Sequence, residues 1–119
     1  MTTLTPTPAS YPPLPTAVAG YFALIDGADK RGIIDLFSPD AVVTDDGRSY
    51  RGRGEITRWL GTAASEYTVT STRLSVESAG GVVTVTTRLE GNFPGGIVDL
   101  RNIFTLDAAG LITSLQITV

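Results

Sequence analysis

The sequence predicts one α+β domain in which helices come first and a curved antiparallel sheet follows. Apolar residues recur at helical spacing over much of residues 16–64, and they alternate with polar residues from residue 67 onward. A chain of 119 residues can build one hydrophobic core and is too short for two. We therefore expect residues 1–15, rich in Thr and Pro, to be a flexible lead and residues 16–119 to form a single domain.

Three segments have the helix period. The first covers residues 16–25, with Thr16 as its candidate N-cap. The second covers residues 29–37 and is expected to end because Pro39 follows. The third covers residues 54–64. The side chains expected to face the core from these helices are Val18, Tyr21, Phe22, Ile25, Ile33, Ile34, Phe37, Ile56, Trp59 and Leu60.

The strand signals lie between and after these helices. Residues 41–45 and 49–51 flank the turn former Asp46-Gly47. Four longer strands are expected at Tyr67–Glu77, Gly81–Gly91, Ile97–Leu106 and Leu111–Val119. Their connections have hairpin length, so neighbouring strands should pair antiparallel. Three helices on one face of a long bent sheet form a cone-shaped α+β barrel. Side chains are not expected to fill the interior of this barrel completely, and the space that remains favours a ligand pocket.

Composition excludes several kinds of chemistry. The chain has no Cys and no His, so it cannot use thiolate or Ser-His-Asp nucleophiles or the commonest zinc ligands. Acid–base work must fall to Asp, Glu, Tyr, Arg or the single lysine, Lys30. The net charge of −3, without basic runs, argues against nucleic acid or an anionic membrane as a partner. No segment reads as a signal peptide or a membrane span, so we expect a cytoplasmic protein.

Two stretches resemble a known superfamily. From Ala17 to Asp45 the chain reads AVAGYFALIDGADKRGIIDLFSPDAVVTD, and from Asn102 to Leu115 it reads NIFTLDAAGLITSL. Both resemble the nuclear-transport-factor-2-like superfamily, which includes the SnoaL-like polyketide cyclases and the bacterial ketosteroid isomerases. The spacing from the helix tyrosine to the strand aspartate is closest to that of ketosteroid isomerase. The resemblance covers most of residues 17–119.

This resemblance implies roles for three residues. Asp45 falls where the isomerases have the general base, Tyr21 where they have the tyrosine of the oxyanion hole, and Asn102 where they have a protonated aspartate. Moving a proton beside a carbonyl needs a base and donors aimed at the enolate oxygen, so the chemistry is coherent. The amide of Asn102 would donate at any pH. Leu60 lies near the place where some isomerases carry a further tyrosine, and the loop between Asp45 and Gly52 looks shorter than in the family.

The family resemblance and strand alternation together predict the pocket wall. The expected partner is a hydrophobic, steroid-like or polyketide-like small molecule, bound without a metal or cofactor. The family also implies a homodimer through the outer sheet face, around Thr84, Thr86, Arg88, Asp99 and Arg101. The side chains expected to line the pocket are Phe37, Trp59, Leu60, Val85, Thr87, Leu89, Leu100, Phe104, Leu115 and Ile117.

Other interpretations stay open. Asp45 can be an ordinary turn residue, and Tyr21 an ordinary core residue. The chain can be a non-catalytic binding or accessory protein. Asp99 and Arg101 share a strand face and resemble, in reversed order, the acid–arginine set of limonene epoxide hydrolases. Strand alternation puts them opposite Asn102, unless a bulge shifts the register. The last strand offers only Gln116 and hydroxyls, so the aldol mechanism of SnoaL-like cyclases is less favoured.

Overall fold

The structure is a computed structural model that describes residues 14–27 and 29–119; most of the expected N-terminal lead, residues 1–13, lies outside the described residues. In chain order the elements are helix α1 (Thr16–Leu24), 3₁₀ helix η1 (Arg31–Leu36), strands β1 (Phe37–Asp45) and β2 (Arg48–Arg51), helix α2 (Gly52–Gly61), 3₁₀ helix η2 (Ala63–Ser65), and strands β3 (Val69–Ala79), β4 (Val82–Gly91), β5 (Ile97–Leu106) and β6 (Ile112–Thr118).

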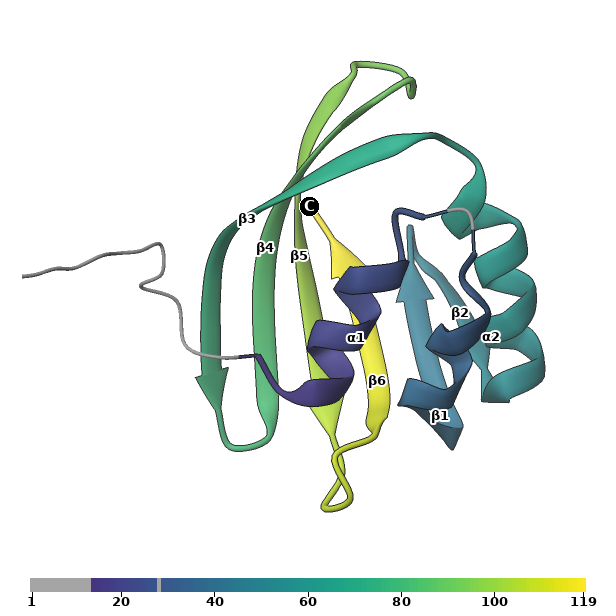
Figure 1. Ribbon diagram of the computed structural model, residues 1–119, viewed down its shortest axis with the longest axis vertical. Helices are drawn as coiled ribbons and strands as arrows, with labels where there is room; N and C mark the ends of the chain where they lie inside the picture. Colours follow the sequence, from purple (N-terminus) through teal and green to yellow (C-terminus); the bar gives the residue numbers. More distant parts are fainter. Residues whose placement is uncertain (1–13, 28) are drawn as a thin grey trace, which may run out of the picture.

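The six strands of the described residues join in one sheet, in the order β2-β1-β6-β5-β4-β3. The predicted α+β class is confirmed, and the sheet is curved but not closed, since β2 and β3 are its two edges. Strands β3 to β6 pair antiparallel as predicted, whereas β1 pairs parallel with β6, a pairing that the sequence did not predict. In Figure 1, α1 lies over β5 and β6, and α2 lies beside β1 and β2.

The second predicted helix is shorter than expected. A 3₁₀ helix covers only Arg31–Leu36, and Phe37 already begins β1, so Pro39 lies inside a strand rather than after a helix. Proline drives the residue before it toward extended backbone, which favours early strand entry. Because proline cannot donate a ladder hydrogen bond, it is tolerated where the register between β1 and β6 shifts, between Phe37 and Val42.

The other two helices differ from the prediction only at their ends. Helix α1 stops at Leu24, and Pro15, not Thr16, is its N-cap. Helix α2 begins at Gly52, where the side chain of Glu55 accepts a hydrogen bond of 2.7 Å from the backbone N–H of Arg51. None of the helices in the described residues is long and apolar enough to cross a membrane.

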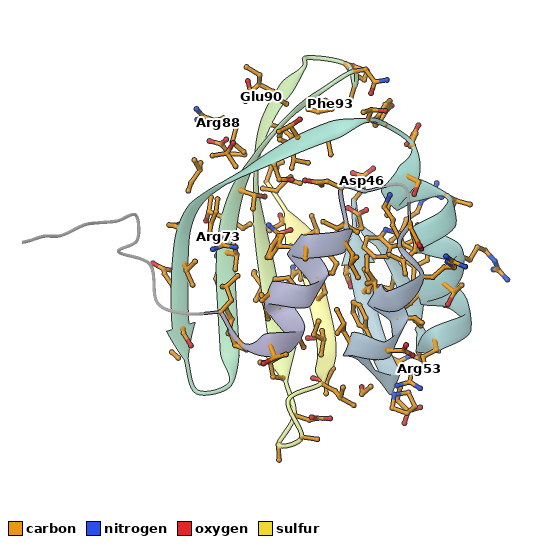
Figure 2. All side chains as sticks on the ribbon, viewed as in Figure 1. Asp46, Arg53, Arg73, Arg88, Glu90 and Phe93 are labelled. Atoms are coloured by element: carbon orange, nitrogen blue, oxygen red, sulfur yellow. The ribbon has the colours of Figure 1, made fainter. Side chains whose placement is uncertain are left out.

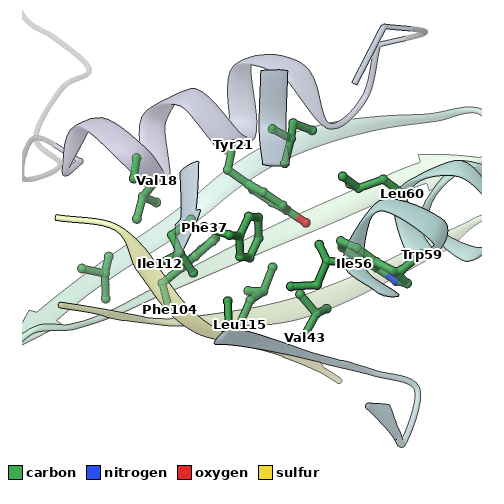
Figure 3. Close-up of a cluster of buried hydrophobic side chains, with 14 of the residues drawn as sticks. Val18, Tyr21, Phe37, Val43, Ile56, Trp59, Leu60, Phe104, Ile112 and Leu115 are labelled. Carbon is green, nitrogen blue, oxygen red and sulfur yellow. The ribbon is translucent and has the colours of Figure 1, made fainter. Parts of the chain in front are cut away.

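The core lies between the helices and the inner face of the sheet (Figure 3). Strand β4 follows the predicted alternation, because Val83, Val85 and Thr87 are buried while Arg88 and Glu90 are exposed (Figure 2). Three expected core residues are only partly buried, namely Phe22, Ile25 and Ile34. The buried apolar residues are Ala17, Val18, Tyr21, Ile33, Phe37, Ala41, Val43, Ile56, Trp59, Leu60, Val83, Val85, Phe104, Ile112 and Leu115.

Candidate active site

A cavity of about 730 Å³ opens on the inner face of the sheet, where strands β3, β4 and β5 extend past the helices. This volume is in the range of small-molecule sites. Tyr21, Asp45 and Asn102, which come from α1, β1 and β5, all line this cavity. Most of the remaining wall is apolar or aromatic.

Tyr21 lies at the boundary between the core and the cavity. Its ring packs edge-on against Phe104 and Phe37, with centroid distances of 5.3 and 6.5 Å. The residue is 3% exposed, and its hydroxyl has no hydrogen-bond partner among the described residues. Among the described residues, every fully enclosed side-chain N or O atom has a hydrogen-bond partner. Because the Tyr21 hydroxyl has none, it is not fully enclosed and opens onto the cavity that Tyr21 lines. Figure 3 shows it directed toward the end of α2 that carries Trp59.

Burial raises the pKa of the Tyr21 phenol far above its ordinary value of 10.0. The negative charges of Asp45 and, more weakly, Asp26 raise it further. Tyr21 therefore stays protonated throughout the physiological range and keeps its O–H proton available for donation.

Asp45 is the last residue of β1 and is half-buried. A tight turn follows it, in which Asp46 (φ 53°) and Gly47 (φ 76°) both adopt the left-handed conformation typical of two-residue hairpins. Trp59 is 1% exposed and donates its indole N–H to Oδ2 of Asp45 at 3.0 Å. Oδ1 of Asp45 accepts no hydrogen bond from the described residues, so one oxygen is held by α2 and the other is open to a ligand.

Asn102 is buried, with 4% exposure, and its amide is engaged within the fold. Its Nδ2 donates to the backbone oxygen of Val85 at 2.9 Å and to Oγ1 of Thr87 at 3.1 Å. A carboxamide has only two N–H bonds, so both are used. In this arrangement Asn102 therefore has no N–H left to offer to a ligand, contrary to the expectation from the family resemblance, because the Val85 backbone oxygen and Thr87 Oγ1 on the neighbouring strand accept both N–H bonds.

The predicted pocket wall divides into two groups. Trp59, Thr87, Leu89, Leu100 and Ile117 line the cavity. The other five were expected there but are buried in the core, because the helices cover that end of the concave face. They are Phe37, Leu60, Val85, Phe104 and Leu115.

The sequence interpretation missed an aromatic pair at the rim of the cavity. Tyr67 precedes β3, and Phe93 lies in the β4–β5 hairpin (Figure 2). Their rings meet edge-on, with centroids 6.0 Å apart. Backbone and side-chain hydrogen bonds between Thr68 and Asn92 join the two loops. Large aromatic residues beside predicted turns, where burial is not required, were the available signal.

The rival constellation of charged residues faces the other way. In β5, Val98, Leu100 and Asn102 line the cavity, whereas Asp99 and Arg101 are exposed and do not. The β4–β5 register is unbroken from Val82↔Thr105 to Glu90↔Ile97, so no bulge turns Arg101 inward. Asp99 instead pairs with Arg88 at 2.8 Å on the outer face. This pairing lowers the pKa of the Asp99 carboxyl.

Comparisons with known proteins agree with this architecture. The model of the SnoaL-like domain family matches residues 18–115, while no curated protein matches the chain. A candidate polyketide cyclase from Sinorhizobium meliloti is 32% identical, with a TM-score of 0.81 over 88% of this chain and 95% of that one.

Two mycobacterial structures are more distant and show the shared fold alone. The Δ5-3-ketosteroid isomerase of a Mycobacterium species is 23% identical, with a TM-score of 0.71 over 87% of this chain and 89% of that one. A Mycobacterium tuberculosis protein in complex with estradiol-17β-hemisuccinate is 20% identical, with a TM-score of 0.72 over 87% and 90%. Because the family model spans most of the residues and the folds superpose, this chain belongs to the SnoaL-like domain family and has the ketosteroid-isomerase type of nuclear-transport-factor-2-like fold.

Proposed function

We propose that the protein is a cofactor-independent enzyme that moves a proton next to a carbonyl group of a hydrophobic small molecule. The observation that carries this proposal is the convergence of Asp45 and Tyr21 on one largely apolar cavity. Their coupling supports it, since the charge of Asp45 contributes to the raised pKa of Tyr21. The reaction is of the isomerase or lyase type.

In the proposed reaction Asp45 is the general base. Its free Oδ1 takes a proton from the carbon beside the carbonyl, the C–H electron pair forms the enolate double bond, and charge develops on the carbonyl oxygen. Return of the proton to another carbon of the conjugated system completes an isomerisation. The indole of Trp59 fixes the carboxylate by holding Oδ2 at 3.0 Å.

Tyr21 is the proposed donor to the enolate oxygen. Its hydroxyl opens onto the cavity, and its raised pKa keeps it in the neutral, donating form. Its ring is fixed by Phe104 and Phe37, so little reorganisation is needed when charge appears. A donor that is already in place stabilises the transition state more than one that must be ordered first.

The comparisons support a hydrophobic carbonyl compound of steroid-like or polyketide-like character as the substrate. One structural neighbour is named as a ketosteroid isomerase, another as a candidate polyketide cyclase, and a third holds a steroid ester. The five aromatic side chains of the wall suit fused or conjugated rings. They are Tyr21, Phe22, Trp59, Tyr67 and Phe93.

We also infer a cytoplasmic homodimer formed through the outer sheet face. Support comes from the sheet, whose outer face carries the half-buried Thr84 and Thr86 beside the charged Arg88, Asp99 and Arg101. Light scattering of the purified chain and of Thr86→Arg tests the dimer. A monomeric wild type, or a dimer that Thr86→Arg leaves intact, would contradict this interface.

The enzymatic proposal is tested with cyclic ketones that bind the protein. NMR in deuterated water measures how fast the hydrogen atoms on the carbon beside the carbonyl exchange for deuterium. Asp45→Asn should reduce the exchange rate about 10²- to 10⁴-fold while leaving the fold intact by circular dichroism. Asp40→Asn is the matched control, since Asp40 lies in the same strand β1, is exposed and does not line the cavity. Equal rates in wild type and Asp45→Asn would overturn the proposal, and tight ketone binding without exchange would indicate a binding protein.

A further inference from the structure

We propose that Thr87, rather than Asn102, is the second hydrogen-bond donor to the substrate oxygen, and that Asn102 acts by positioning Thr87. This inference rests on the proposed proton transfer and adds a catalytic residue to it. It begins from the number of donors that Asn102 has and where each one goes.

Neither N–H of Asn102 is available to a ligand. One meets the Val85 backbone oxygen at 2.9 Å, and the other meets Thr87 Oγ1 at 3.1 Å. The Val85 carbonyl fixes which way round the amide sits, because a carbonyl oxygen can accept but cannot donate. Rotating the amide by half a turn would set its own oxygen against that carbonyl, so the N–H side must face Val85 and Thr87.

The hydroxyl of Thr87 still has its O–H proton available for donation. Its Oγ1 accepts the Asn102 bond, and its O–H finds no acceptor among residues 14–27 and 29–119. The residue is 3% exposed and lines the cavity, so a bound ligand is the natural partner for this proton. Because Thr87 is β-branched, its side chain has few alternative rotamers on a packed strand.

The sheet register explains the arrangement. Asn102 lies directly opposite Val85, and Thr87 lies opposite Leu100, so Thr87 and Asn102 are diagonal neighbours on the inner face. The amide therefore donates into the hydroxyl oxygen from the neighbouring strand. Donation into an O–H group polarises it and makes it a better donor, so Asn102 strengthens the bond that Thr87 offers.

Tyr21 and Thr87 would then bind the substrate oxygen from two sides of the cavity. Tyr21 comes from α1 and Thr87 from β4, and both are buried polar groups whose donated proton has no acceptor in the described residues. Removing one such donor from an oxyanion site typically lowers turnover about 10²- to 10³-fold. The same donors should hold a phenolate, which resembles the enolate in charge and shape, or the corresponding phenol, which resembles it in shape.

The experiment compares Thr87→Val, which keeps the side-chain shape but loses the hydroxyl, with Thr87→Ser, which keeps the hydroxyl. We expect Thr87→Val to lower the deuterium-exchange rate about 100-fold and Thr87→Ser to stay within about threefold of wild type. Melting curves check that both variants fold. If Thr87→Val does not fold, Thr87→Ala takes its place against the same Thr87→Ser control.

A double-mutant cycle separates the two roles. Because Asn102 acts through Thr87, Asn102→Ala should slow exchange in the Thr87 background and add little in the Thr87→Val background. Additive losses would show that Asn102 acts independently of Thr87, and a Thr87→Val variant as active as wild type would show that Thr87 is not a donor to the substrate. Either result would overturn the inference.

Phenol binding makes the test independent of turnover. Titration of a fluorescent naphthol should give about tenfold weaker binding to Thr87→Val than to wild type or Thr87→Ser. Equal affinities would overturn the role of Thr87. Failure of the enzyme proposal is distinguishable, since it leaves Asp45→Asn without effect whatever the Thr87 variants do.

Discussion

The space between the helices and the sheet has two parts, and Tyr21 belongs to both. On one side its ring joins Phe37 and Phe104 in a cluster where neither neighbour is exposed. On the other side the same sheet face carries Thr87 and Leu89 and borders the cavity of about 730 Å³. Only the C-terminal ends of α1 and α2, with Tyr21, Phe22 and Trp59, border the second part, so the difference arises from where the helices end and not from a change in the strands (Figure 1).

This difference separates stability from chemistry along single strands. In β5, Phe104 belongs to the filled part, while Asn102 and Leu100 belong to the open part. Truncating a close-packed side chain removes dispersion contacts on all of its sides. A side chain that borders the cavity has no such contacts on its open side, so its truncation removes fewer. The packed part should therefore determine the free energy of unfolding, and the open part should determine ligand binding.

The largest expected effect contrasts Phe104→Ala with Leu89→Ala. Phe104→Ala should lower the free energy of unfolding by about 3–5 kcal/mol, because it empties a fully enclosed site. Leu89→Ala should cost about 1 kcal/mol or less, since Leu89 is half-exposed and borders open space. Urea unfolding measures both values, and similar losses for the two variants would contradict the division.

A smaller effect concerns the boundary residue at alkaline pH. The pKa of Tyr21 is raised in the folded state, so folding favours its protonated form. The stabilisation of the folded protein by this preference is complete below the unfolded pKa of about 10, and it is lost as the pH rises above that value. Relative to Tyr21→Phe, wild type should lose up to about 1.4 kcal/mol per pH unit above pH 10.

Unfolding free energies of wild type and Tyr21→Phe between pH 8 and 11 measure this difference. The ring packing is retained in Tyr21→Phe, so the two proteins should have nearly parallel stability profiles below pH 9. Parallel profiles across the whole range would mean that folding does not raise the pKa of Tyr21, which would contradict its burial at this boundary.

The smallest effect is expected on the outer face. Arg101→Ala should leave the deuterium-exchange rate within about twofold of wild type, because Arg101 is exposed and does not line the cavity. Arg88→Ala is a control on the same face. A large loss of activity in Arg101→Ala, with Asp45→Asn still active, would favour chemistry of the epoxide hydrolase kind.

The elements of the filled part could be predicted because short-range rules determine them. Alternation assigned the inner and outer faces of β4 correctly, and helical spacing assigned Ile56, Trp59 and Leu60 to the core. The parallel pairing of β1 with β6 was not predictable in this way, since the two strands are joined by most of the chain and no turn fixes their register. Pro39 misled the interpretation because proline is as compatible with a strand irregularity as with a helix end.

The cavity was harder to predict than the core. Alternation shows which side of a strand faces inward, but not how far along it the helices reach, so Phe104 and Leu100 looked equivalent. A buried amide such as Asn102 can be recognised from the sequence, yet which of its atoms are already bonded depends on Val85 and Thr87 across the strand. The indole of Trp59 beside Asp45 likewise depends on the docking of α2 against β1.

Strand β5 carries polar side chains on both of its faces, at alternating positions. Asn102 faces the cavity, and Asp99 and Arg101 face outward. A one-residue insertion after Gly96 that slips this strand would exchange the two sets, because every side chain changes face at once. An evolving lineage would thereby replace a neutral amide with a carboxylate and a guanidinium in a single step. New chemistry on this scaffold would then begin as a change in backbone length, before any catalytic residue is substituted.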